Sequence, residues 1–155
     1  MTSDRARLIG PPPLLVVGCI VIGFIAGHFQ ALPLLPSRSV WEIVLGSILV
    51  IVAVAVIASA RRTFIARGTH VNPYRPTTAV VTTGIYRFTR NPIYISFLLV
   101  LLAFGFLTNS LWFVLTTPLL FLLLHFGVVR REETYLLGKF GEPYRQYCGR
   151  VRRWI

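Results

Sequence analysis

The sequence predicts an all-α integral membrane protein with four transmembrane helices, a helical hairpin, a structured cytoplasmic loop and an amphipathic C-terminal cap. The 155 residues are 55% hydrophobic and their mean hydropathy is +0.70, which exceeds what the core of a soluble domain needs. Four stretches are apolar and nearly long enough to cross a bilayer. The basic residues gather on one side of these stretches, as expected for a membrane protein.

The predicted spans are 13–32, 40–60, 92–107 and 111–129. A hydrocarbon core of roughly 30 Å takes about 20 helical residues, so the third span is short. The turn signal Thr108-Asn109-Ser110 carries no charge and separates the third span from the fourth. The last two spans should therefore form a tight antiparallel hairpin within a single domain, 1–155.

The distribution of charge predicts the orientation. The chain has 16 Lys and Arg residues against 5 Asp and Glu residues, and four spans leave only Arg38 on the side opposite the other basic residues. Both termini, the loop 61–91 and the tail 130–155 are therefore expected to be cytoplasmic. The first span is read as a retained anchor rather than a cleaved signal. Binding to nucleic acid is not expected, because neither a basic helix nor a zinc spacing accompanies the charge.

Several isolated residues in the spans and the tail allow more than one interpretation. Gly23 and Gly27 form a GxxxG pair, which suits close helix packing within the chain or a homodimer contact. His28 and His125 are expected to be packing residues, although His125 lies near the charged residues after the fourth span. Cys19 and Cys148 are not expected to pair, and neither sits in a metal-binding spacing.

Two polar clusters flank the predicted hairpin. The first, 84–94, leads into the third span, and the second, 130–133, follows the fourth. A tight hairpin returns the chain to the same membrane face, so the clusters should meet there. Glu132 and Glu133 are two of only five acidic residues, and a carboxylate at the membrane boundary needs a partner to offset its desolvation.

The segments beside these clusters also have predictable forms. Residues 79–84 read as an extended run that closes on a turn. Residues 134–147 are amphipathic and aromatic, and are expected to lie on the membrane surface and cap the mouth of the hairpin.

Five short motifs follow one another in the second half of the chain. They are Gly84-Ile85-Tyr86, Arg90-Asn91-Pro92-Ile93-Tyr94, Glu132-Glu133 with Leu136, Phe140-Gly141-Glu142 with Tyr144 and Tyr147, and Val151-Arg152-Arg153. In this order and spacing they resemble the isoprenylcysteine carboxyl methyltransferase and phospholipid methyltransferase superfamily. The resemblance covers about half of the chain.

The resemblance implies an enzyme of the bacterial inner membrane that uses S-adenosylmethionine and no metal, and releases S-adenosylhomocysteine. Carried over by position, the cofactor-binding residues come from the loop, the start of the third span and the second cluster. They are Thr78, Ala79, Val80, Val81, Tyr86, Asn91, Pro92, Ile93, Tyr94 and Glu132. Asn91 stands where the carboxyl methyltransferases usually have His.

The expected catalytic residues are Arg131 and Glu133. Val128 occupies the position of the family's substrate-side Arg, so Arg130 or Arg131 has to replace it. An Arg would orient a carboxylate acceptor, whereas Glu133 would take the proton from an amine acceptor.

The expected acceptor is a membrane lipid or another lipophilic molecule, as in the isoprenylcysteine enzymes. A phospholipid amine N-methyltransferase is the nearest alternative. Two alternatives of other classes remain, a sterol-reductase-like enzyme that uses NADPH and a non-catalytic membrane module.

Overall fold

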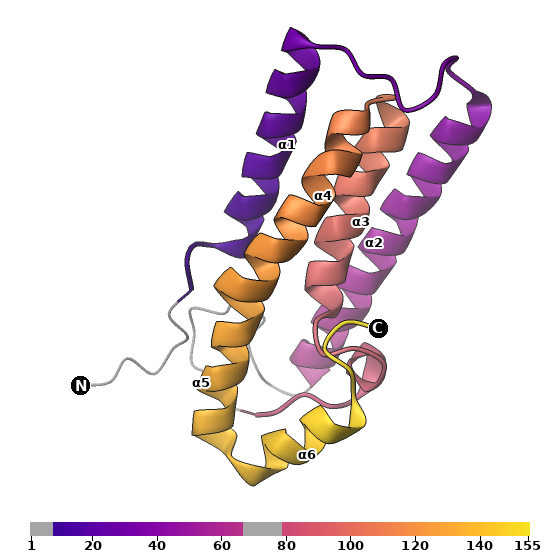
Figure 1. Cartoon of the computed structure of the whole chain (residues 1–155). Helices are drawn as coiled ribbons and strands as arrows, with labels where there is room; N and C mark the ends of the chain where they lie inside the picture. Colours follow the sequence, from indigo (N-terminus) through magenta and orange to yellow (C-terminus); the bar gives the residue numbers. More distant parts are fainter. Residues whose placement is uncertain (1–7, 67–78) are drawn as a thin grey trace.

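The computed structural model describes residues 8–66 and 79–155, and within these ranges the protein is built from helices and loops without a strand (Figure 1). The elements, in chain order, are α1 (Pro12–Phe29), α2 (Val40–Ala66), the 3-10 helix η1 (Gly84–Arg87), α3 (Pro92–Leu107), α4 (Leu111–Leu124), the π-helix η2 (His125–Val129), α5 (Arg130–Phe140) and α6 (Glu142–Arg150). The predicted extended run therefore forms no strand over residues 79–84, where η1 begins at Gly84.

Within residues 8–66 and 79–155, three helices are long and apolar enough to cross a membrane. They are α1, α2 and the continuous helix Leu111–Phe140, which joins α4, η2 and α5. Its apolar part ends at Val129, and α5 begins with two Arg residues. α3 is also apolar but has only 16 residues, so its crossing, and with it the count of four spans, stays a prediction.

The predicted boundaries hold best for α3, which begins at Pro92 and ends at Leu107. α1 ends at Phe29, three residues earlier than predicted, because Gln30 takes an extended backbone. α2 continues six residues beyond the predicted end, to Ala66. The side chains of Arg61 and Arg62 are exposed there, and long basic side chains at a helix end can reach water from an apolar segment.

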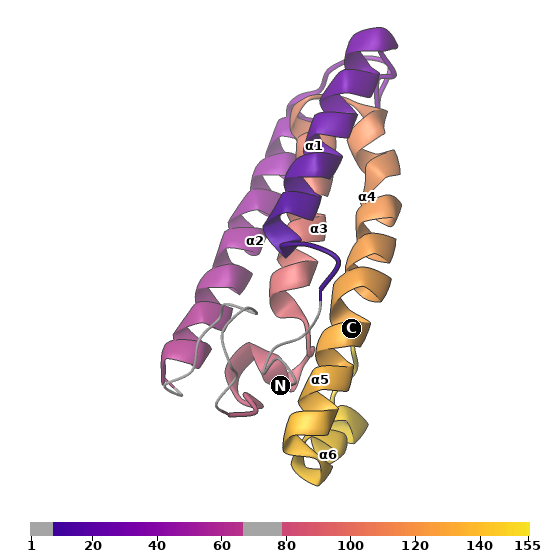
Figure 2. The same ribbon diagram turned by 90° about the vertical axis from the view of Figure 1, so that its left-hand side faces the viewer.

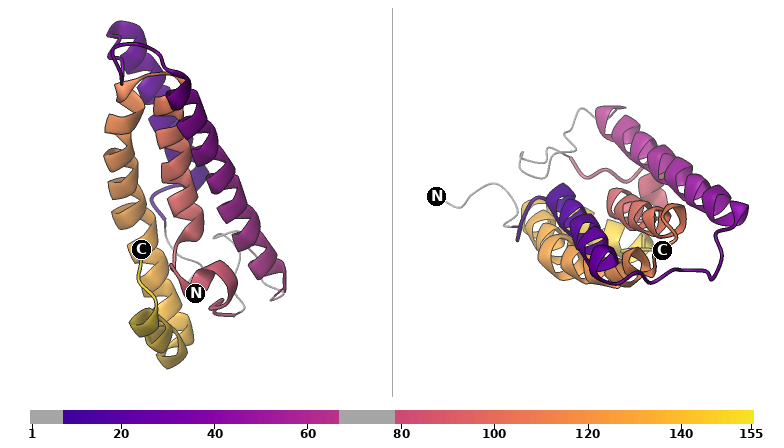
Figure 3. Two further views of the ribbon diagram at one scale, coloured as in Figure 1. Left: turned by 90° about the vertical axis from the view of Figure 1, so that its right-hand side faces the viewer. Right: turned by 90° about the horizontal axis from the view of Figure 1, so that it is seen from above.

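The hairpin of α3 and α4 forms the centre of the bundle. α2 packs along α3 and α1 packs along α4, so α1 and α2 lie on opposite sides of the hairpin (Figures 2 and 3). The main core joins α1, α3 and α4 through Val16, Cys19, Leu101, Phe113 and Leu120. Many large apolar side chains of α1 and α2 remain exposed on their outer faces, as suits contact with lipid.

Glycines allow the outer helices to approach this hairpin closely. A Cβ atom added at Gly23 of α1 would lie 2.7 Å from two ring atoms of Phe113 in α4, and one at Gly46 of α2 would lie 2.7 Å from Leu107 in α3. Gly27 faces Ser110 and Trp112 at longer distances. The GxxxG face is thus occupied by α4 of the same chain, which favours the intramolecular reading over a homodimer contact.

The turn between α3 and α4 holds the loop that connects α1 to α2. Asn109 adopts a positive φ of 47°, a conformation that Asn tolerates better than most residues. Its side-chain oxygen accepts a hydrogen bond of 2.9 Å from the Leu35 backbone N–H, and the Trp112 indole N–H donates one of 2.7 Å to the Gln30 carbonyl. These hydrogen bonds therefore stabilise the end of the bundle that lies opposite the two polar clusters.

At the opposite end, α5 extends the line of α4 and the chain then turns into α6 (Figure 1). The turn is made by Gly141, whose φ of 60° is readily adopted only without a side chain. Tyr144 and Tyr147 of α6 are buried with Val151, packed against Val80, Leu136 and Phe140. The predicted cap thus consists of two helices rather than one surface helix, and its position relative to a membrane stays a prediction.

Candidate functional site

The two polar clusters meet at the end of the hairpin, as the sequence predicts. Tyr94 lies in the first turn of α3 and Glu132 in the first turn of α5. The Tyr94 hydroxyl donates a hydrogen bond of 2.8 Å to Oε1 of Glu132. Arg90, four residues before Tyr94, and Glu133, directly after Glu132, form an ion pair of 3.1 Å. Residues about forty positions apart therefore build one polar site.

Glu132 has an unusual electrostatic environment. Burial raises the pKa of its carboxyl to about 7, the nearby charge of Glu133 raises it further, and the hydrogen bond from Tyr94 works in the opposite direction. Among the described residues, these three influences dominate, and none of them supplies a positive charge. A carboxylate that is costly to ionise in the protein alone is suited to bind a cationic group of a ligand.

Glu133 differs from its neighbour because two guanidinium groups hold it. Arg153 donates from Nε to Oε1 at 3.0 Å and from Nη2 to Oε2 at 2.7 Å, and the Nη1 atom of Arg90 lies 3.1 Å from Oε1. The hydrogen bonds to Glu133 raise the pKa of Arg153 above its ordinary value. Such two-point pairing favours a positioning role for Glu133 over the proton-accepting role considered from the sequence.

Asn91 is buried and ties the start of α3 to the C-terminal residues. Its Nδ2 atom donates a hydrogen bond of 2.8 Å to the Arg153 carbonyl, and its backbone N–H donates one of 3.1 Å to Oγ1 of Thr89. Pro92 is also buried, at the first helical position of α3. The hydrogen bonds of Asn91 therefore hold the backbone in place at the start of α3, three residues before Tyr94.

Three of the loop residues predicted to bind the cofactor, Val80, Val81 and Tyr86, belong to apolar clusters that join the loop to other helices. Val81, Tyr86 and Ile93 belong to one apolar cluster with Ala60 and Phe64 of α2. Tyr86 accepts a hydrogen bond of 2.8 Å at its carbonyl from the Tyr147 hydroxyl of α6. Burial raises the pKa of its phenol, and the charges of Tyr147 and Glu132 raise it further.

The remaining predicted site residues are Thr78, Ala79, Val80 and Arg131. Ala79 and Val80 are half-buried, and Val80 packs against the tyrosines of α6. Thr78 lies outside the described residues. Arg131 is exposed on α5, one position before Glu132, at the end of the apolar part of the helix.

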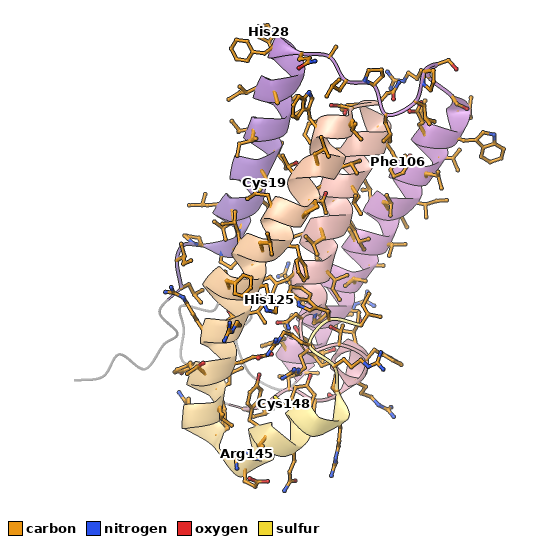
Figure 4. The ribbon with its side chains drawn as sticks, viewed as in Figure 1. Cys19, His28, Phe106, His125, Arg145 and Cys148 are labelled. Atoms are coloured by element: carbon orange, nitrogen blue, oxygen red, sulfur yellow. The ribbon has the colours of Figure 1, made fainter. Side chains whose placement is uncertain are left out.

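Two features of the site were not found from the sequence. The helix is a π-helix over His125–Val129, a form that is frequent at functional sites. Trp154 also packs against this segment, with its indole N–H donating to Nδ1 of His125 at 3.2 Å. Figure 4 shows His125 and Cys148 at this end of the bundle and His28 at the other. The Arg and Trp residues within 151–155 could have suggested that the C-terminal segment contacts the site. No rule of sequence spacing, however, predicts that Trp154 contacts His125.

An apolar helical bundle with a polar site at one end is typical of an integral membrane protein. Residues 41–143, about two thirds of the chain, match the phospholipid methyltransferase family. The protein belongs to this family of membrane methyltransferases. An uncharacterized protein of Haemophilus influenzae is 46% identical over 65 residues, which is 41% of this chain and 100% of that relative. No solved structure matches the chain.

Proposed function

We propose that this protein is an S-adenosylmethionine-dependent methyltransferase of the bacterial inner membrane that acts on a lipophilic acceptor. The observation that carries the proposal is the contact between Tyr94 and Glu132 inside the family-matched region. Both residues were assigned to the cofactor from the sequence. Their contact supports the proposal because it anchors the Glu132 carboxylate, and none of the three main influences on that carboxyl among the described residues is a positive charge.

The residues present fit such a cofactor. S-adenosylmethionine carries an amino group and a sulfonium, and when bound it supplies a methyl group that is already activated for transfer. Glu132 would accept a hydrogen bond from the ammonium group of the cofactor, with Tyr94 holding the carboxylate in place. Tyr86, Val81 and Ile93, which pack together in one apolar cluster, would form the apolar wall.

The protein's own contribution to the reaction is then mainly positioning. A nucleophilic acceptor has to be aligned with the methyl group and separated from water. Arg131 lies exposed where the apolar part of the helix ends, so it is suited to bind an anionic group of an acceptor that arrives from the membrane. Glu133, held by Arg90 and Arg153, would fix the cofactor side of the site instead of exchanging a proton.

The orientation of the protein follows from the same arrangement. The site, α5 and α6 lie at the end of the bundle that carries Arg61, Arg62 and Arg130. Positive residues are retained in the cytoplasm, where S-adenosylmethionine is made. S-adenosylmethionine would reach such a site from the cytoplasm, and the lipophilic acceptor would reach it sideways from the membrane.

Ligand-dependent thermal stability of the purified full-length protein in detergent tests the proposal. A ligand that binds only the folded state raises the melting temperature, so S-adenosylhomocysteine should stabilise the protein and NADPH at equal concentration should not. Stabilisation by NADPH alone would favour the reductase class. Failure of both ligands to stabilise a folded sample would favour a non-catalytic module.

A further inference from the structure

Residues 151–155 follow α6 and return to the bundle, where they contact three elements of the site. Figure 1 shows this segment turning back beside the lower end of α3. The family match ends at residue 143, and the motif Val151-Arg152-Arg153, which contributes to the resemblance, carries no assigned role. Val151 is buried, and Arg153 and Trp154 are half-buried, although they stand at the end of the described chain.

The first contact is with the loop that precedes α3. The Arg90 backbone N–H donates a hydrogen bond of 3.1 Å to the Arg152 carbonyl. The Asn91 side-chain amide donates one of 2.8 Å to the Arg153 carbonyl. Two successive carbonyls of the C-terminal segment therefore hold two successive residues of the loop, and Tyr94 follows within one helical turn.

The second contact is with α5. Arg153 forms its two-point ion pair with Glu133, the residue directly after Glu132. The Glu133 side chain is only 16% exposed, so its charge needs compensation from the protein. Arg90 supplies part of this compensation from the loop, and Arg153 joins the loop and the helix through one residue.

The third contact is with η2. The Trp154 ring lies 5.0 Å from the Phe121 ring and 6.2 Å from the His125 ring, measured between centroids. Its indole N–H also donates to His125. An aromatic side chain with a satisfied N–H is a strong anchor, so Trp154 fixes the position of Arg153 beside it.

We propose that Arg153 is a positioning residue of the cofactor site, which holds Tyr94 and Glu132 at their contact distance by neutralising Glu133 and by binding the loop before α3. This inference rests on the proposed function. Without Arg153, the Glu133 carboxylate would keep Arg90 as its one guanidinium partner among the described residues, and an excess negative charge would lie next to Glu132. Helix α5, which carries Glu132, would also lose the ion pair that joins it to residues 151–155, the segment whose Arg153 carbonyl binds Asn91.

Calorimetric titration of S-adenosylhomocysteine into the full-length protein in detergent tests this role in four variants. Arg153→Gln removes the charge and is expected to weaken binding at least tenfold. Arg153→Lys keeps the charge without the two-point geometry and should bind with intermediate affinity. Arg150→Gln removes an exposed Arg of α6 and should bind like the unmodified protein. The double variant Glu133→Gln with Arg153→Gln should bind more tightly than Arg153→Gln alone, because the carboxylate that lost its Arg153 partner is then removed from position 133.

The results separate the inference from the function on which it rests. If the unmodified protein is folded and does not bind S-adenosylhomocysteine, the proposed function is wrong. If it binds and Arg153→Gln binds equally well, or if the double variant and Arg153→Lys recover nothing, only the positioning role is wrong. Should Arg153→Gln fail to fold, the comparison of Arg153→Lys with Arg150→Gln decides, and equal affinities would contradict the inference.

Discussion

The Tyr94 hydroxyl and the Glu132 carboxylate are joined by a hydrogen bond of 2.8 Å between α3 and α5. This bond connects the two ends of the hairpin at the proposed cofactor site. It also opposes the effect of burial on the pKa of Glu132, so Tyr94 influences both the place and the charge of the carboxylate.

Replacing Tyr94 by Phe should weaken the binding of S-adenosylhomocysteine about tenfold, or about 1.4 kcal/mol. The substitution removes only the hydroxyl, and a hydrogen bond to a charged group contributes about 1.5 to 3 kcal/mol. Calorimetric titration measures the change. Tyr135→Phe on α5, which removes the hydroxyl that accepts a hydrogen bond from Lys139, is the matched control and should leave affinity unchanged. Equal affinities for both variants would remove Tyr94 from the site.

Binding should also depend on pH through Glu132. A cationic ligand favours the ionised carboxylate, and burial raises the pKa of that group to about 7. Affinity should therefore fall as the pH decreases through 7 and be about tenfold weaker at pH 6 than at pH 8. The folding stability of the protein without ligand should depend on pH in the opposite direction. The raised pKa of Glu132 stabilises the folded state at low pH, and this contribution is lost as the pH rises through 7.

Among the described residues, Tyr94 from α3 and the neighbouring Glu133 act on the Glu132 carboxyl, whose charge acts in turn on Tyr86 of η1. Glu133 is paired with Arg90 and Arg153. Titrations of S-adenosylhomocysteine between pH 6 and pH 8 test the assignment. Glu132→Gln should abolish the pH dependence in this range. A pH profile that survives this substitution would assign the titration to another group.

Replacing Asn91 by Ala should lower the free energy of unfolding by about 1 to 3 kcal/mol. The change removes the donor to the Arg153 carbonyl and loosens the C-terminal residues from the start of α3. Thermal unfolding in detergent measures it, with Thr82→Ala at an exposed loop position as the control. A melting temperature equal to that of the control would show that this buried hydrogen bond contributes little.

Replacing Gly23 by Ala should destabilise the protein by about 1 to 3 kcal/mol. The new methyl group would meet the Phe113 ring at 2.7 Å, whereas a Cβ at Gly18 of the same helix meets nothing within 4 Å. Gly18→Ala should therefore be neutral in the same thermal measurement. If Gly23→Ala instead left stability unchanged and altered the oligomeric state, the GxxxG pair would serve a contact between copies of the chain.

The sequence was sufficient for features that depend on local chemistry. Pro92 starts α3, the turn at 108–110 ends it, and the meeting of the two polar clusters follows from the hairpin. The roles of the two acidic residues were not predictable, because Glu133 is paired with an Arg twenty positions away, whereas Glu132 has Tyr94. The hydrogen bond of Asn91 to Arg153 spans 62 positions, and no periodicity or spacing encodes a contact of that range.

Calorimetric titration of S-adenosylhomocysteine into the unmodified protein and the Glu132→Gln variant, both at pH 8, tests the central claim most directly. The unmodified protein should bind, and the variant, which keeps the shape of the side chain and loses its charge, should bind at least tenfold more weakly. Equal binding by the two folded proteins would place the cofactor elsewhere. Absence of binding to either would contradict the assignment of this site to S-adenosylmethionine.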